Sequence, residues 1–181
     1  MADIETLAPF ILSFEGGFVD HPNDRGGATN KGVTLSTWRS YGYDIDTDGD
    51  IDVEDLKSLS DREVIDHILR PHYWDRCRAD EIQDQSIANM VVDWVWGSGA
   101  WGIKHTQQVL GLERDGVVGP KTLEALNGDN PEAIFEALKR RREQHFRSIV
   151  DNDPSQGVFL NGWLRRLECI GYNELKLNGN G

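Results

Sequence analysis

The sequence predicts a mostly α-helical fold of two helical lobes, with a small β-hairpin or loop beside a cleft. Apolar residues recur at helical spacing along residues 7–14, and the segments 56–69 and 131–150 also have helical patterns. By contrast, residues 18–34 are crowded with turn-forming residues and carry only short apolar pieces, which is typical of a loop or small hairpin. A chain of 181 residues can bury roughly 70% of its unfolded surface, enough for one medium domain or a domain with a small second lobe.

Composition and charge argue against several classes of protein. No apolar run approaches ~18 residues, so we expect no membrane span. The N-terminal segment lacks a basic stretch leading into an apolar one, so we also expect no secretory signal peptide. The net charge of −12 argues against a nucleic-acid partner. The two cysteines, Cys77 and Cys169, have neither metal-site nor disulfide-framework spacing, and we interpret them as buried residues in a reducing compartment.

The first helix carries the candidate catalytic acid, Glu15. The helix is expected to begin near Thr6, its predicted N-cap, and to end at Gly16. Its apolar stripe consists of Leu7, Phe10, Ile11 and Phe14. Glu15 lies four residues after Ile11, so it is predicted to continue this stripe toward the core. Burial and the negative end of the helix dipole both favour the protonated carboxyl that a general acid needs. The alternative is an inert, half-exposed Glu at a fraying helix end.

The turn-rich segment after Glu15 supplies candidates for a second catalytic group. We expect this segment to fold back and to bring Asp20, Asp24 and Thr29 within reach of the Glu15 carboxylate. Glycoside hydrolysis commonly needs a protonated acid and a second group that activates water or stabilises the cation. For Asp24 the alternative is that its side chain only caps a turn.

Two motifs in this region resemble a known family. Residues 14–18 (Phe-Glu-Gly-Gly-Phe) and 24–34 (Asp-Arg-Gly-Gly-Ala-Thr-Asn-Lys-Gly-Val-Thr) look like the start of glycoside hydrolase family 108. The members of that family are N-acetylmuramidases whose Glu-Gly-Gly motif carries the catalytic acid. The order Glu15, Asp24, Thr29 is also similar to that of phage-type lysozymes, although Thr29 arrives one residue early. The resemblance therefore implies a lysozyme-like fold, with Glu15 as the acid and with Asp24 and Thr29 as its partners.

Residues 44–55 form a strongly acidic segment, with seven acids and no base. Their spacing matches the ligand positions of an EF-hand calcium loop, with Gly49 at the sixth position and Ile51 at the eighth. The predicted metal ligands are Asp44, Asp46, Asp48, Asp50 (through its backbone carbonyl), Asp52 and Asp55. Because these uncompensated acids repel one another, we predict a structural Ca²⁺ in this loop. Asp55 replaces the usual Glu of the twelfth position, and its shorter reach weakens the expected binding. The alternative is a solvated acidic loop.

Aromatic residues gather in two later segments. Pro71 is expected to interrupt the helix that spans 56–69, and the His-Tyr-Trp cluster of residues 72–74 follows it. Such a cluster either stacks on sugar faces or belongs to the core. The second segment, residues 90–102, holds Asp93 and three tryptophans around a Gly-Ser-Gly break at 97–99. Family members resemble it in having an Asp-containing helix here, usually with Asn near the break. We expect one of these tryptophans in the saccharide cleft and the others in the core.

The C-terminal half is predicted to be helical. Residues 107–122 resemble the helical peptidoglycan-binding lobe of the same family, and residues 159–166 resemble its C-terminus. The long helix at 131–150 carries basic residues that we expect on a solvated face, namely Lys139, Arg140, Arg141, Arg142 and Arg147. Phe159 and Trp163, four residues apart, are expected to pack the last helix down.

Together these features predict three segments: a lysozyme-like catalytic lobe (1–91), a helical peptidoglycan-binding-like lobe packed against it (92–177) and a disordered tail (178–181). The resemblance implies hydrolysis of the β-1,4 bond between N-acetylmuramic acid and N-acetylglucosamine in peptidoglycan. The expected substrate-binding residues are Asp20, Tyr73, Asp93, Trp96 and Trp101. We expect a monomer that acts on glycan strands without a catalytic cofactor and reaches the cell wall by phage-type lysis or a dedicated secretion system.

Two alternatives to this hypothesis stay open. A lytic transglycosylase would use Glu15 alone and would close the sugar on its own hydroxyl. A non-catalytic, calcium-stabilised cell-wall binding module would need no catalytic acid.

Overall fold

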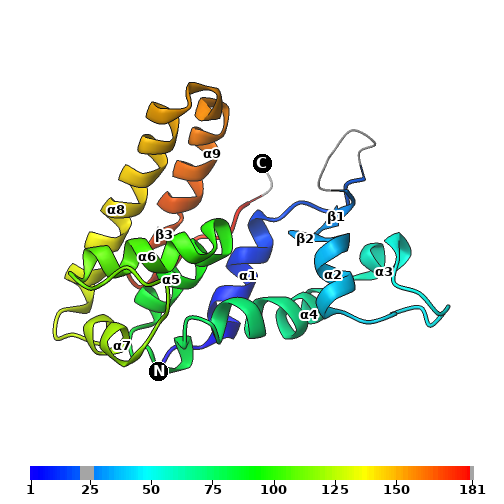
Figure 1. Cartoon of the computed structure of the whole chain (residues 1–181), viewed down its shortest axis with the longest axis horizontal. Helices are drawn as coiled ribbons and strands as arrows, with labels where there is room; N and C mark the ends of the chain where they lie inside the picture. The colour runs from blue at the N-terminus through cyan, green and yellow to red at the C-terminus, as the bar shows by residue number, and fades with distance from the viewer. Residues whose placement is uncertain (21–26, 180–181) are drawn as a thin grey trace.

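The computed structural model describes residues 1–20 and 27–179, which form a mostly helical protein with two small strand pairs (Figure 1). The helical elements are α1 (Ile4–Phe14), α2 (Leu35–Tyr41), α3 (Val53–Ser58), α4 (Asp61–Val64), the π-helix η1 (Ile65–Trp74), the 3-10 turn η2 (Ala79–Glu81), α5 (Gln85–Ser98), α6 (Ala100–Val109), α7 (Pro120–Leu126), α8 (Pro131–Asn152), the 3-10 turn η3 (Pro154–Gln156) and α9 (Gly157–Glu168). The antiparallel strand pairs are β1 (Thr29–Asn30) with β2 (Val33–Thr34), and β3 (Ile170–Gly171) with β4 (Glu174–Leu175).

The elements form two lobes on either side of α1 (Figure 1). We call β1, β2 and α2 to α4 the hairpin lobe, and α5 to α9 the helical lobe. Each has its own apolar core: Trp38, Leu56 and Ile68 belong to the smaller one under the hairpin, whereas α1, α5 and α8 share the larger one. Leu12, Tyr73 and Trp96 pack against both cores, and they therefore mark the junction of the two lobes.

Helix α1 begins earlier than the sequence analysis predicted. Asp3, not Thr6, is the N-cap, and its side chain accepts a hydrogen bond from the Glu5 amide. Asp is among the best N-cap residues, and it satisfies an amide that would otherwise lack a partner. Pro9 lies inside the helix on its exposed side. The helix ends at Phe14, as the glycines that follow predicted, and Glu15 takes an extended backbone conformation as the C-cap.

The predicted hairpin is present, and its turn explains its sequence. Lys31 and Gly32, the two residues between β1 and β2, both have positive φ angles, of 51° and 76°. Two such residues in a row form the tight turn that matches the right-handed twist of a two-stranded hairpin. The Lys31 amide donates to the Gly16 carbonyl at 3.1 Å, and Val19 pairs with Thr29. These bonds tie the hairpin to the segment that directly follows Glu15.

Helix η1 corrects the expectation that Pro71 would end the helix there. The chain continues through Pro71 to Trp74 in the wider π-helical form, and the Asp75 amide bonds to the Arg70 carbonyl five residues earlier. Proline cannot donate an amide hydrogen bond, and a wider turn accommodates its ring within a helix. As a result Trp74 is fully buried in the core, while Tyr73 reaches the junction of the lobes.

The expected solvated face of the long helix is only partly correct. Helix α8 spans Pro131–Asn152, and Arg140 and Arg147 are exposed on it as predicted. Arg142, however, is only 3% exposed. It lies on the same helix face as the buried Phe135, Leu138 and Phe146, at spacings of three to four residues. An arginine at such a position needs a buried partner, which the site described below provides.

The last helix and the tail also differ from expectation. Phe159 stacks on Trp163 with ring centroids 6.0 Å apart, yet it remains 53% exposed. Asn178, predicted to be disordered, is held in place: its amide donates to Oγ of Ser13 at 3.0 Å, and its side chain accepts from Arg165. Among the described helices, none is both long and apolar enough to cross a membrane.

Candidate active site

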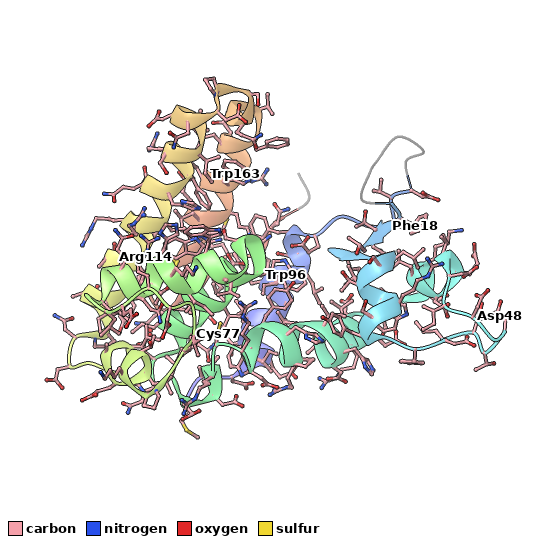
Figure 2. The ribbon with its side chains drawn as sticks, viewed as in Figure 1. Phe18, Asp48, Cys77, Trp96, Arg114 and Trp163 are labelled. Carbon is pink, nitrogen blue, oxygen red and sulfur yellow. The ribbon has the colours of Figure 1, made fainter. Side chains whose placement is uncertain are left out.

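Glu15 does not continue the apolar stripe of α1 into the core, because the helix ends one residue before it. Leu7, Phe10 and Ile11 are fully buried, whereas the Glu15 side chain is 19% exposed and turns into a pocket of about 420 Å³. The residues that line this pocket are Glu15, Gly32, Tyr73, Trp96, Gly97, Ser98, Arg142, Phe146, Ile149, Trp163 and Arg166. They come from both lobes, and Figure 2 shows Trp96 near the end of α1 and Trp163 on α9.

The two carboxylate oxygens of Glu15 have different surroundings. Oε1 accepts hydrogen bonds from Nε1 of Trp96 at 2.7 Å and from Nη1 of Arg166 at 3.2 Å. Oε2 faces Gly32, and a Cβ atom added at Gly32 would lie 2.7 Å from it. Within the described residues, we find no hydrogen-bond donor to Oε2. Within the part of the chain that the structure describes, the site therefore holds Oε1 in place by two donors and gives Oε2 none.

A buried chain of charges holds Arg166 beside Glu15. Asp93 is fully buried, and its Oδ1 accepts from Nε and Nη2 of Arg166 at 3.1 and 2.7 Å. On its other side, Nη2 of Arg142 lies 2.8 Å from Oδ2 of Asp93. Burial alone would raise the pKa of Asp93, but the two guanidinium groups, Arg142 first, outweigh burial and hold that pKa below its ordinary value. Asp93 is thus a buried anion between two cations.

This chain of charges corrects one prediction and adds two residues that the sequence analysis missed. Asp93 was expected to bind substrate, but at 0% exposure it cannot contact a glycan strand. It instead positions Arg166, which contacts both Glu15 and the pocket. A sequence signal for Arg142 existed, because it falls on the apolar face of its helix. We find no comparable signal for Arg166, which lies 151 residues from Glu15 along the chain.

The comparisons with known proteins agree with this architecture. Residues 8–99 match the family profile described as Glycosyl hydrolase 108. The chain belongs to the glycosyl hydrolase 108 family. Residues 101–168 match the profile described as "Predicted Peptidoglycan domain". The protein is therefore a glycoside hydrolase that acts on peptidoglycan, as the motifs around Glu15 led us to expect.

One solved structure is similar over almost the whole chain. The structure of SagA from Brucella abortus has 29% sequence identity and a TM-score of 0.73, and the match covers 99% of each chain. No curated protein matches the chain. The predicted fold class, mostly α and lysozyme-like with a small β-hairpin, is confirmed. The two family matches divide at the break between α5 and α6, whereas the expected lobe boundary at 91/92 falls within α5.

The other predicted site residues of this family 108 hydrolase lie in different places. Tyr73 packs on Trp96, with ring centroids 4.6 Å apart, and both line the pocket of Glu15. Trp101 does not line it: the side chain is 56% exposed on α6, with the Lys104 ammonium over its ring. The tryptophan that contacts Glu15 in the pocket is thus Trp96, not Trp101.

The candidates for a second catalytic group are only partly described. Asp24 lies outside the described residues. Asp20 is exposed directly after Val19, and the half-buried Thr29 pairs with Val19 in the backbone. Neither Asp20 nor Thr29 lines the pocket. Both are nonetheless on the segment that the Lys31–Gly16 hydrogen bond holds against the end of α1.

The acidic loop between α2 and α3 folds in part as the EF-hand pattern predicts. Carboxylate oxygens of Asp44, Asp46 and Asp48 lie within 4.8 Å of one another. The Gly49 amide donates to Asp44 at 2.9 Å, and the φ angle of Gly49 is +109°, so glycine is suited to this turn. Figure 2 shows Asp48 at the outer end of the hairpin lobe, well away from Trp96. Any metal here would therefore act on stability and not on the reacting bond.

The later positions of the loop differ from the predicted ligand set. Asp52 does not join the carboxylate cluster and instead caps α3 by accepting from the Glu54 amide, whereas the role predicted for the backbone carbonyl of Asp50 stays a prediction. Asp55 is fully buried, and its two oxygens accept from the amides of Ile45 at 2.6 Å and Asp52 at 2.8 Å. Asp55 thus closes the loop by bonding to both of its ends. The carboxylates of this loop repel one another: the Asp48 carboxylate, more than burial, raises the pKa of Asp50.

Proposed function

We propose that the protein is an N-acetylmuramidase, which hydrolyses the β-1,4 bond between N-acetylmuramic acid and N-acetylglucosamine with Glu15 as the general acid. The observation that carries this proposal is the asymmetry of the Glu15 carboxyl. Trp96 and Arg166 hold Oε1, while Oε2 lies against Gly32, which lines the same pocket as Glu15. In this proposal Oε2 carries the proton that passes to a glycosidic oxygen.

The reaction then proceeds as follows. The proton of Glu15 passes to the leaving oxygen as the bond from that oxygen to the anomeric carbon breaks. A water molecule supplies the oxygen that bonds to the same carbon, and its proton passes to a second carboxylate. We assign that role to Asp24 or to Asp20, assisted by Thr29.

The products of cleavage test this proposal against the transglycosylase alternative. We expect purified peptidoglycan to yield muropeptides with free reducing ends, because a second carboxylate can activate water. A transglycosylase would yield anhydro sugars, each lighter by one water. Mass spectrometry of the digest decides between them in one measurement, and predominantly anhydro ends would contradict the hydrolytic assignment. A non-catalytic binding module, the remaining alternative, would release no fragments at all.

We further propose that the acidic loop binds Ca²⁺ as a structural ion. Three carboxylates converge at Asp44, Asp46 and Asp48, and oxygen atoms are the ligands that Ca²⁺ prefers. The ion would offset the mutual repulsion of these three carboxylates. Its role would be to stabilise the hairpin lobe, which presents Gly32 to Glu15.

Calcium should accordingly raise the melting temperature of the protein. A ligand at about a hundredfold excess over its Kd adds about 2.7 kcal/mol to the free energy of unfolding, which corresponds to about 5–10 °C for a chain of this size. Melting followed by circular dichroism, with calcium and with a chelator, measures this difference. The variant Asp46→Asn should lose most of the calcium-dependent increase. Identical curves for the native protein in the two conditions would disprove a structural calcium ion.

A further inference from the structure

A second pocket adjoins the Glu15 pocket, and the proposed reaction leaves it unused. Its volume is about 510 Å³, and it shares Tyr73 and Trp96 with the first pocket but no other residue. The side chains come from α2, η1, the turn that follows η1 and the end of α5, and they include Tyr41, His72 and, from that turn, Arg76. The two pockets therefore lie on either side of the Tyr73–Trp96 pair, which Figure 2 locates through the labelled Trp96.

The charge of this second pocket is unusual for the protein. Its lining contains the guanidinium of Arg76 and no carboxylate, although the chain as a whole carries a net charge of −12. Among the described residues, no carboxylate oxygen lies within ion-pairing distance of Arg76, whereas the nearby Arg78 pairs with Glu81 at 2.6 Å. The positive charge of Arg76 also acts on Tyr73: burial raises the pKa of Tyr73, and Arg76 opposes that rise. The guanidinium therefore lies within electrostatic reach of the wall that the two pockets share.

The remaining walls suit an amphipathic ligand. The rings of Tyr41 and His72 pack together with centroids 3.8 Å apart, and Tyr41 is 51% exposed. Tyrosine and histidine rings offer apolar faces, and an arginine binds carboxylates strongly because its planar donors match them. A ligand for this pocket should thus combine an apolar backbone or side chain with a carboxylate.

We propose that this second pocket binds the carboxylate-bearing peptide stem of the peptidoglycan strand whose sugar bond lies over Glu15. The inference rests on the proposed muramidase function. The muramic acid ring of that strand carries a peptide through its lactyl group, and a substituent of the sugar bound in one pocket can extend past Trp96 into the other. Arg76 would then bind a carboxylate of the peptide, while Tyr41 and His72 would contact its apolar parts.

Binding to a catalytically blocked protein tests this assignment without relying on turnover. In the Glu15→Gln background, isothermal calorimetry compares two ligands: glycan strands that keep their peptides, and strands whose peptides an amidase has removed. We expect the peptide-bearing strands to bind more tightly. Adding Arg76→Ala should weaken their binding by about tenfold or more, the usual effect of losing a charge-assisted hydrogen bond. The same change should hardly affect the stripped strands, which retain only the lactyl carboxylate.

The controls separate the possible failures. Arg140→Ala removes an equal charge from an exposed position on α8 and should change neither affinity. Arg76→Lys keeps the charge and should restore part of the preference. Equal losses for both ligands in Arg76→Ala would mean that Arg76 binds the sugar or the lactyl group, and no loss would remove it from the site. Either result overturns the peptide assignment. Anhydro products from the native protein would instead overturn the proposed hydrolysis and leave this binding result intact.

Discussion

The variant Glu15→Gln is expected to lose wall-clearing activity by about 10²–10⁴-fold, the usual contribution of general acid catalysis. Glutamine has the shape of glutamate, and its amide oxygen can still accept the hydrogen bond that Trp96 donates. It has no acidic proton to give to the glycosidic oxygen. The decisive measurement is the loss of turbidity of purified cell walls, with circular dichroism to show that the variant is folded.

The structure also changes what we expect for the stability of this variant. From the sequence, a charge at the end of a buried stripe would be unfavourable, so its removal should be neutral or slightly stabilising. In the fold, however, the Glu15 carboxylate accepts from Arg166 at 3.2 Å. Losing that partly buried ion pair should cost about 1 kcal/mol. Glu5→Gln, on the exposed side of the same helix, is the matched control and should keep full activity. Near-native clearing by Glu15→Gln would mean that Glu15 is structural and that the assigned pocket is wrong.

The second large effect is expected at Asp93. Replacing it with Asn removes the anion between two cations and leaves Arg142 buried without a counter-ion. Breaking a buried ion pair by removing one partner typically costs about 3–5 kcal/mol. Urea unfolding should therefore show a large loss of stability for Asp93→Asn. Asp151→Asn, an exposed change on α8, should stay within about 0.5 kcal/mol of the native protein.

A double-mutant cycle and a pH series show whether the lost stability comes from the ion pair. Adding Arg142→Met to Asp93→Asn removes the unpaired charge and should recover part of the loss. Since the pKa of Asp93 is lowered in the fold, its contribution to stability is present above the unfolded value of about 3.9 and is lost as the pH falls through the lowered folded value. Asp93→Asn should therefore lack this acid-dependent loss. A variant as stable as the native protein would show that the buried charges contribute little to the fold.

Short-range patterns were sufficient for most elements of the fold. The glycines after Glu15 predicted where α1 ends, and Pro120 and Pro131 begin α7 and α8 as the first-turn preference of proline predicts. These features depend on backbone preferences of a few consecutive residues, which a sequence displays directly. The same local logic failed at Pro71, where packing of Trp74 in the core continues the helix past a residue that normally ends one.

The composition of the site was harder to predict, because its members are distant in the sequence. The motif indicated Glu15 and the aromatic cluster indicated Tyr73, yet nothing local distinguishes Trp96 from Trp101 as the partner of the acid. Only the fold brings the indole of Trp96 to 2.7 Å from Oε1, across 81 residues of chain. Trp101, after the break at Gly99, faces solvent instead.

What the sequence by itself determined is the helical class of the protein, the presence of a hairpin or loop beside the cleft, the family and the candidate acid at the end of α1. Each of these depends on residues that are close neighbours along the chain. The tertiary structure decided which charges are paired: it buries Asp93 between Arg142 and Arg166 and brings Arg166 to Glu15. The physical reason is that a buried charge must find its partner in space, and helices from opposite ends of the chain supply those partners only when they pack together.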